Sequence, residues 1–181
     1  MRIIAGSLRG RRLNPPANLP VRPTTDMARE SLFNILNNYV DFDACKVLDL
    51  FAGTGAVSLE FISRGCISVT AIDINAACTD FIKHTTKELN ISNLRVVRAD
   101  VFELLRRPNQ QFDIIFADPP YAAPDLVHLP EMVLQNNILT DNGIFILEHP
   151  RDYSFETVPH FWQHRAYGKV NFSFFAREIE D

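Results

Sequence analysis

Apolar residues recur along most of the chain with two alternating periods. Short runs rich in β-branched and aromatic residues, such as 46–51 and 112–117, are typical of buried strands. Between these runs apolar positions recur at helical spacing, as they do at 76–89. Regular alternation of strand and helix is typical of a parallel sheet covered on both faces by helices. The pattern predicts strands at 46–51, 68–73, 94–98, 112–117, 144–147, 164–167 and 170–176 and helices at 57–63, 76–89, 102–106 and 126–136.

The last two strands break this alternation. Residues 164–167 and 170–176 are separated only by Gly168 and Lys169, which leaves no room for a crossover helix. Such a short connection favours an antiparallel hairpin. We therefore predict an α/β fold with a seven-stranded, mostly parallel sheet and an antiparallel hairpin at its C-terminal edge.

The residues before the first strand form a separate segment. Residues 2–13, with glycines near the tip, predict a small basic β-hairpin, and the four prolines within 14–23 predict an extended linker. Threonine and aspartate N-cap candidates then open an amphipathic helix of roughly 15 residues within 24–39. We divide the chain into an N-terminal arm at 1–23 and one α/β domain at 24–181.

Composition limits the class of protein. A hydrophobic content of 46% in 181 residues is enough for one domain with a well-covered core. No apolar run approaches a membrane span or a signal-peptide core, so we expect a cytoplasmic protein with no membrane partner. The cysteines, Cys45, Cys66 and Cys78, show no C-x-x-C spacing, and the five histidines are scattered, so we assign no disulfide and no metal. We expect a monomer.

The charge is divided unevenly along the chain. The net charge is −4, but residues 1–30 hold six arginines against two acidic residues, so their balance is +4 and the remainder carries −8. A basic arm on an acidic body indicates a polyanionic partner such as RNA. The candidate RNA-binding residues are Arg2, Arg9, Arg11, Arg12 and Arg22.

A glycine turn follows the first predicted strand. Gly53-Thr54-Gly55 lies between an apolar strand and a helix, the context expected of a nucleotide-cofactor turn. The third glycine of the dinucleotide fingerprint is replaced by Ser58, which disfavours NAD and FAD. Asp49 would repel a pyrophosphate but suits a ligand that carries an ammonium and a sulfonium, as S-adenosylmethionine does.

Carboxylates also follow the next two strands. Asp73 can accept hydrogen bonds from ribose hydroxyls, and Asp100 can accept one from an adenine amino group. Each alone could be a helix cap or a turn residue, but three at consecutive strand ends favour a binding site. The predicted cofactor residues are Asp49, Phe51, Gly53, Thr54, Gly55, Asp73, Ile74, Asp100 and Val101.

The segment Asp118-Pro119-Pro120-Tyr121 ends the strand at 112–117. Consecutive prolines offer no N–H, so carbonyl oxygens are the main-chain polar groups there. With the Asp118 carboxylate they can hold both hydrogens of an exocyclic amine while the tyrosine ring stacks on the base. Four residues alone are equally compatible with a plain strand-ending turn. With the glycine turn beside them, we take all four as catalytic candidates.

These motifs together resemble the class I methyltransferases, which have a Rossmann-like fold, and Asp118–Tyr121 matches the fourth motif of members that methylate exocyclic amines. Met1–Gly6, Arg22–Asp26, Arg29–Asn34 and Leu48–Gly55 look like the RsmD family of bacterial methyltransferases, although Thr54 replaces a more usual serine. The resemblance implies methyl transfer from S-adenosylmethionine to N2 of a guanine in 16S ribosomal RNA, within an assembling small subunit.

Three alternatives remain open at this stage. The same four residues can hold an adenine N6 amine in DNA or RNA. A non-catalytic RNA-binding protein could keep the fold without the reaction, although the intact Asp49, Asp73 and Asp118 disfavour it. An NAD-dependent reductase would have to explain Ser58 and has no use for the two prolines.

Overall fold

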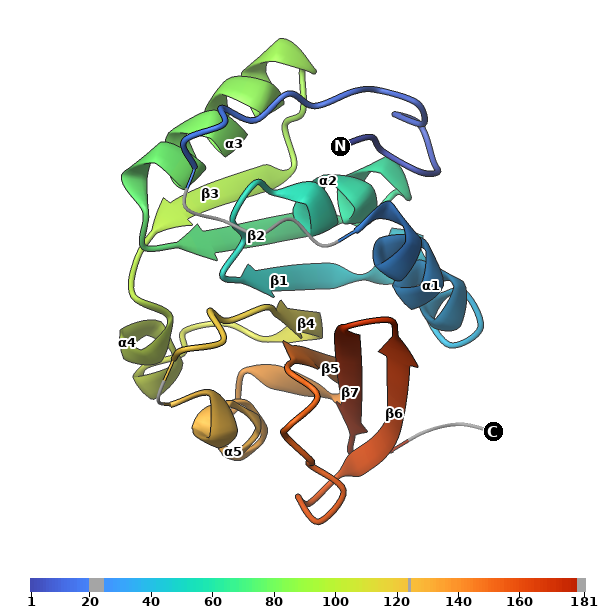
Figure 1. Ribbon diagram of the computed structural model, residues 1–181, viewed down its shortest axis with the longest axis vertical. Coiled ribbons are helices and arrows are strands. Elements are labelled where there is room, and N and C mark those ends of the chain that lie inside the picture. The colour runs from blue at the N-terminus through green and yellow to red at the C-terminus, as the bar shows by residue number, and fades with distance from the viewer. Residues whose placement is uncertain (20–24, 124, 179–181) are drawn as a thin grey trace.

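A computed structural model describes residues 1–19, 25–123 and 125–178. Its centre is one sheet in the strand order β3-β2-β1-β4-β5-β7-β6 (Figure 1). β1 to β5 are parallel, whereas β7 is antiparallel to β5 and β6 is antiparallel to β7. The strands are β1 Lys46–Leu50, β2 Ser68–Asp73, β3 Leu94–Arg98, β4 Phe112–Ala117, β5 Leu139–His149, β6 Phe161–Tyr167 and β7 Val170–Ala176. The predicted seven-stranded sheet and its antiparallel edge are confirmed.

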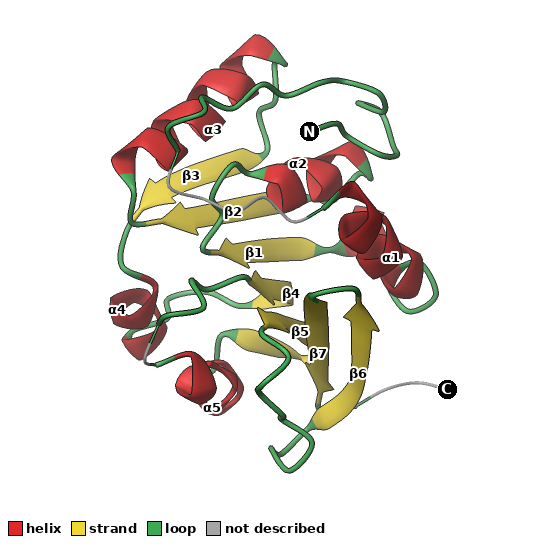
Figure 2. Ribbon diagram, in the orientation of Figure 1, coloured by secondary structure: helices red, strands yellow, loops and turns green. Residues whose placement is uncertain are grey.

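Helices cover both faces of the sheet (Figure 2). One apolar cluster joins the sheet to α1, α2 and α3, and a second joins its other face to α4 and α5. The helices are α1 Asp26–Leu36, α2 Ala56–Ser63, α3 Ala76–Glu88, α4 Val101–Arg106 and α5 Leu129–Gln135, with short 3-10 turns η1 Phe42–Ala44 and η2 Leu126–His128. The order of the strands places the topological switch point between β1 and β4, where ligands bind in open α/β sheets.

The bounds of several predicted elements differ from those in the structure, and those of α1, β5 and β6 are examples. α1 ends at Leu36 rather than near Tyr39, because the following residues form a turn. β5 is longer than the predicted 144–147: its start pairs with β4 across a bulge, and its end pairs with β7. β6 begins at Phe161 because residues 161–163 also pair with β7. Polar residues at both ends of β5 hid its full length from a prediction based on apolar runs.

The predicted N-terminal hairpin is not formed as a pair of strands. Residues 1–13 make a loop closed by a single antiparallel bridge between Arg2 and Arg12. Ile3 and Leu13 are 2% and 6% exposed and belong to the core cluster that faces α1 and α2. This segment therefore packs on the body. The proposed boundary at residue 23 falls outside the described residues and stays a prediction.

The edge hairpin also contacts α1's side of the molecule through aromatic rings. Tyr39, in the turn after α1, meets Trp162 of β6 edge to face, with ring centroids 4.6 Å apart. Trp162 meets Phe174 of β7 in a similar geometry at 6.0 Å. These contacts pack the turn after α1 against the edge of the sheet opposite to β3.

Candidate active site

The glycine turn lies between β1 and α2, as predicted. Phe51, Gly53 and Gly55 have φ values of 64°, 56° and 74°, so the chain turns sharply through left-handed conformations. A Cβ at Gly55 would lie 2.9 Å from the Ile82 side chain of α3, which leaves space for glycine only. The Ala52 N–H donates to the Ile72 carbonyl at 2.8 Å. The turn is therefore fixed against β2 and holds its backbone at the carboxyl edge of the sheet.

Asp49 lies beneath this turn and is 1% exposed. Its Oδ2 accepts hydrogen bonds from both the backbone N–H, at 3.1 Å, and the hydroxyl of Ser58. Burial raises the pKa of the Asp49 carboxyl to about 7, while the Ser58 hydrogen bonds act in the lowering direction. A positively charged ligand bound beside a buried carboxyl group favours its ionised form and is attracted to it in return. Ser58, which replaces the third glycine, thus serves to hold Asp49.

Asp73 joins β2 to the glycine turn. Its Oδ2 accepts from the Gly53 N–H at 2.8 Å, and its Oδ1 accepts from the Asn75 N–H at 2.8 Å. The neighbouring Ile74 is 62% exposed, an unusual exposure for an apolar side chain beside a cofactor turn. These two predicted residues lie together at one edge of the sheet.

Asp100 lies at the amino end of α4 and acts as its N-cap. Its Oδ1 accepts from the N–H groups of Phe102 at 2.8 Å and Glu103 at 3.2 Å. The helix-cap interpretation of Asp100 is therefore confirmed, and its contact with an adenine amine stays a prediction. Val101 is 3% exposed and packs into the second core cluster.

The Asp118–Tyr121 segment leaves β4 directly beside the end of β1. Asp118 donates its N–H to the Leu50 carbonyl at 3.4 Å, so the segment begins next to the glycine turn. Pro119 is buried, whereas Tyr121 is 38% exposed. The Pro120 carbonyl accepts from the Ala123 N–H at 2.8 Å and closes a turn. The structure thus brings the predicted catalytic segment and the predicted cofactor turn to the same switch point.

Four of the five predicted RNA-binding arginines, Arg2, Arg9, Arg11 and Arg12, are exposed. Arg22 lies outside the described residues. Arg2 Nε lies 3.6 Å from a carboxylate oxygen of Asp26. A groove of about 360 Å³ beside α1 includes Arg2 and Arg9 in its lining.

The N-terminal segment, residues 1–13, is held on the α/β domain by polar residues of α2. These residues were not singled out from the sequence. Glu60 is 0% exposed and accepts from the N–H groups of Ile4 at 2.8 Å and Ala5 at 3.0 Å. The Ser63 carbonyl accepts from the Ser7 N–H at 2.7 Å. A Cβ at Gly6 would lie 1.7 Å from that carbonyl oxygen, so only glycine allows this approach. The sequence feature that could have identified them is the presence of polar residues within the otherwise apolar helix 56–63.

A buried arginine of α1 also holds the N-terminal segment, and Met1 of that segment contacts the glycine turn. Arg29 of α1 is 1% exposed, and its Nη2 donates to the Arg2 carbonyl at 2.5 Å. Its Nε lies 3.9 Å from Glu60 Oε2. The Thr54 hydroxyl donates to Met1 Sδ at 3.4 Å. The basic segment and the glycine turn are therefore in direct contact.

Glu148 and His149 are not among the predicted site residues. In the structure they end β5 and are 4% and 1% exposed, so they belong to a buried strand end. His149 Nε2 bonds to the Ser173 hydroxyl at 2.8 Å, and burial lowers the pKa of the imidazole. Both residues are positioned by pairing with β7, which no local pattern signals.

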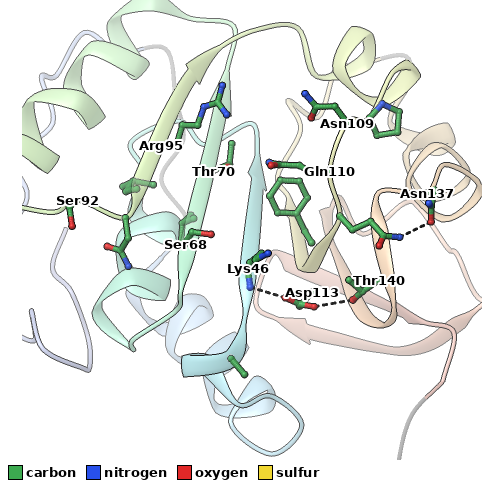
Figure 3. A pocket seen from close by; sticks show the side chains of 17 residues that line it. Lys46, Ser68, Thr70, Ser92, Arg95, Asn109, Gln110, Asp113, Asn137 and Thr140 are labelled. Carbon is green, nitrogen blue, oxygen red and sulfur yellow. Dashed lines mark hydrogen bonds between the residues drawn. The ribbon is translucent and has the colours of Figure 1, made fainter.

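A hollow of about 1050 Å³ lies at the opposite edge of the sheet. It is lined at the amino ends of the strands by residues such as Lys46 and Ser68 (Figure 3). The Asp113 carboxylate there accepts hydrogen bonds from the backbone N–H of Lys46 and from the Thr140 hydroxyl (Figure 3). None of the predicted site residues lines this hollow, so we do not assign the reaction to it.

The described part of the chain offers neither a metal cluster nor a membrane helix. Within it, no group of three or more His, Cys, Asp or Glu residues could hold a metal ion. In the same residues, none of the helices has both the length and the apolar character needed to cross a membrane.

The donor set at the switch point fits S-adenosylmethionine. It contains a buried carboxylate at Asp49, a second carboxylate bonded to the glycine turn at Asp73, and an exposed aliphatic side chain at Ile74. An ammonium, ribose hydroxyls and an adenine ring are the corresponding ligand groups. A pyrophosphate would place its charge near Asp49, which disfavours dinucleotides such as NAD and FAD.

Comparison with known proteins places the chain among methyltransferases. Residues 1–176 match the family described as Conserved hypothetical protein 95. Ribosomal RNA small subunit methyltransferase D of Escherichia coli K12 is 32% identical over 183 residues, which covers 99% of this chain and 91% of the relative. The protein of the same name from Buchnera aphidicola subsp. Baizongia pistaciae is 36% identical over 149 residues, with 82% and 75% covered. The solved structure of yhhF from Escherichia coli superposes with a TM-score of 0.87 at 32% identity and covers 99% of each chain.

Proposed function

We propose a function for this chain on the ground that it belongs to the RsmD family of S-adenosylmethionine-dependent ribosomal RNA methyltransferases. The reaction is transfer of a methyl group to the exocyclic N2 amine of a guanine in 16S ribosomal RNA. The substrate is that RNA within an assembling small ribosomal subunit. The name shared by the Escherichia coli and Buchnera relatives supports the small-subunit RNA, and the chemistry of the site supports the amine.

One observation carries the proposal. The Asp118–Tyr121 segment begins at the end of β4, and the Asp118 N–H bonds to the last residue of β1 immediately before the glycine turn. A base held by this segment therefore lies next to whatever the turn binds. Holding two reactants side by side in the right orientation makes their reaction effectively unimolecular and lowers its barrier.

The cofactor would be held by residues from three strand ends. We assign Asp49 to its ammonium, Asp73 to its ribose hydroxyls, and Ile74 with Val101 to its adenine ring. The backbone of Phe51, Gly53, Thr54 and Gly55 forms the adjoining wall, with Asp100 at the adenine end. When bound, S-adenosylmethionine supplies an electrophilic methyl group on a positively charged sulfur.

The four residues after β4 have distinct roles toward the guanine. The target base is swung out of its stack, and the exposed Tyr121 ring stacks on it. Asp118 and the Pro119 carbonyl accept hydrogen bonds from the amine and turn its lone pair toward the methyl group. Pro120 keeps the segment rigid through its turn with Ala123. Positive charge grows on the nitrogen as the bond from the methyl group to sulfur breaks, and the Asp118 carboxylate stabilises it. S-adenosylhomocysteine is the leaving group, and the methylated nitrogen then loses a proton to water.

The basic segment binds the RNA backbone. The backbone of this segment is anchored on α2 by Glu60 and Ser63. Its exposed arginines therefore present their charge at a fixed place beside the active site. Phosphate contacts of this kind position an RNA without reading its sequence. Because Met1 contacts Thr54, RNA bound on this segment lies close to the cofactor turn.

The test is an assay of modified nucleosides. The protein is incubated with labelled S-adenosylmethionine and either small ribosomal subunits that lack the modification, free 16S RNA, or DNA, and the digested nucleosides are separated by mass. We expect N2-methylguanosine from the ribosomal substrates and no product from DNA. N6-methyladenosine would establish the adenine alternative, and cofactor binding without any product would favour a non-catalytic RNA-binding protein. Asp118→Ala is the matched inactive control.

A further inference from the structure

We propose that Glu148 selects guanine over adenine in the target pocket, an inference that rests on the proposed function. Glu148 lies near the end of β5 and is 4% exposed. In the neighbouring parallel strand, Ala117 pairs with Leu147. One position further along both strands, Asp118 therefore lies beside Glu148. Adjacent strands are about 4.8 Å apart, so the two acidic residues are close neighbours at the edge of the sheet.

Asp118 and Glu148 also point to the same face of the sheet. Side chains alternate along a strand, so Asp118 shares the face of Phe116 and Glu148 shares that of Ile146. Phe116 and Ile146 pair in register and belong to the same core cluster, which faces α1 and α2. Glu148 is also paired with Phe172, another member of that cluster. Two carboxylates on adjacent strands are thus placed beside the proposed position of the base.

A second carboxylate beside Asp118 matches the Watson–Crick edge of guanine. On that edge the N2 amine and the N1–H are adjacent, so two hydrogen-bond donors lie side by side. An ionised carboxylate only accepts hydrogen bonds. While Asp118 and Pro119 hold the amine, Glu148 is placed to accept from N1–H. Hydrogen bonds to an ionised acceptor are about twice as strong as neutral ones.

Adenine presents the wrong group at the same place. Next to its N6 amine, the N1 atom carries a lone pair and no hydrogen. Facing Glu148, that lone pair would set acceptor against acceptor, so adenine meets electrostatic repulsion where guanine gains a hydrogen bond. Repulsion of the wrong base, together with a bond to the right one, is a source of discrimination. Glu148 therefore separates the two amines that Asp118–Tyr121 alone can both hold.

The experiment uses an RNA substrate in which the target guanosine is replaced by 2-aminopurine riboside. This base keeps the N2 amine but carries a lone pair at N1 in place of the N1–H. We measure kcat/KM on both RNAs for the wild type and for Glu148→Gln. The wild type should prefer guanine by on the order of 10²-fold. In Glu148→Gln the side-chain amide can donate to the N1 lone pair, so the preference should fall at least tenfold.

Three comparisons separate this role from a merely structural one. Calorimetry should show the same affinity for S-adenosylmethionine in Glu148→Gln and in the wild type. Glu148→Asp keeps the carboxylate and should keep the preference for guanine, even if its kcat/KM is lower. Glu88→Gln, an exposed change at the far end of α3, should behave as the wild type.

The outcomes also separate this inference from the proposed function. An unchanged preference in Glu148→Gln, in an enzyme that makes N2-methylguanosine, would overturn the role of Glu148 alone. Loss of preference in Glu148→Asp as well as in Glu148→Gln would also overturn it, because the carboxylate would then not be the deciding group. A wild-type enzyme that yields N6-methyladenosine would overturn the proposed function and this inference with it.

Discussion

Replacing Asp49 by asparagine should stabilise the free protein and weaken its binding of S-adenosylmethionine. The Asp49 carboxyl is 1% exposed, and burial raises its pKa from 3.8 to about 7. Between these two values the unfolded chain gives up a proton that the folded protein keeps. The stability of the wild type therefore falls as the pH rises from about 4 to about 7, and it stays lower above pH 7.

The size of the effect follows from the same two pKa values. Roughly three pH units, at about 1.36 kcal/mol each, give a cost of at most about 4 kcal/mol above pH 7. In Asp49→Asn the side chain is uncharged at every pH, and its carbonyl oxygen can still accept the Ser58 bonds. The variant should therefore be more stable than the wild type by about 1.5 kcal/mol at pH 5 and by up to about 4 kcal/mol at pH 8.

Urea unfolding followed by circular dichroism at pH 5 and pH 8 measures this difference. Asp80→Asn, an exposed change on α3, is the matched control and should show no such dependence. Calorimetry with S-adenosylmethionine should show the opposite change: weaker binding by Asp49→Asn, and wild-type binding that strengthens from pH 6 to pH 8. A stability difference that is equal at both pH values would refute the assignment of the raised pKa to Asp49.

Three further results are expected. Asp118→Ala should lower kcat by on the order of 10²- to 10³-fold with little change in cofactor affinity, and equal turnover would contradict its role. Changing Arg9, Arg11 and Arg12 together to Ala should weaken RNA binding and reduce the slope of log Kd against log salt by about two to three, whereas an unchanged slope would argue against phosphate contacts. Glu60→Gln should cost about 2–3 kcal/mol and speed hydrogen exchange at residues 4 and 5, and unaltered exchange there would show that Glu60 does not hold the segment.

The sequence predicted most of the framework because the framework depends on local signals. Apolar runs located every strand, and glycines flanking Thr54 located the cofactor turn, since a positive φ and a close approach to Ile82 leave few other choices. Pro119 and Pro120 marked the end of β4 in the same way. All these features can be read from neighbours in the chain.

What the sequence did not reveal depends on contacts between distant residues. Glu60 has no local motif: its partners, Ile4 and Ala5, lie more than 50 positions away. Glu148 is fixed at the end of β5 by pairing with β7, and no local pattern marks it as part of a strand. The predicted N-terminal hairpin is reduced to one antiparallel bridge, and the backbone groups of this segment also bond to α2, which no local pattern signals.

The aromatic contact between the turn after α1 and the edge strand β6 gives the molecule a built-in optical probe. Trp162 is the one tryptophan in the sequence, and its ring meets Tyr39 edge to face. Its emission reports whether the C-terminal hairpin and the start of the domain are docked together. Trp162 lies on the edge strand, three strands beyond β4 in the order of the sheet. A change in its emission on adding RNA or cofactor would therefore mean that binding alters the structure at a distance from the active site.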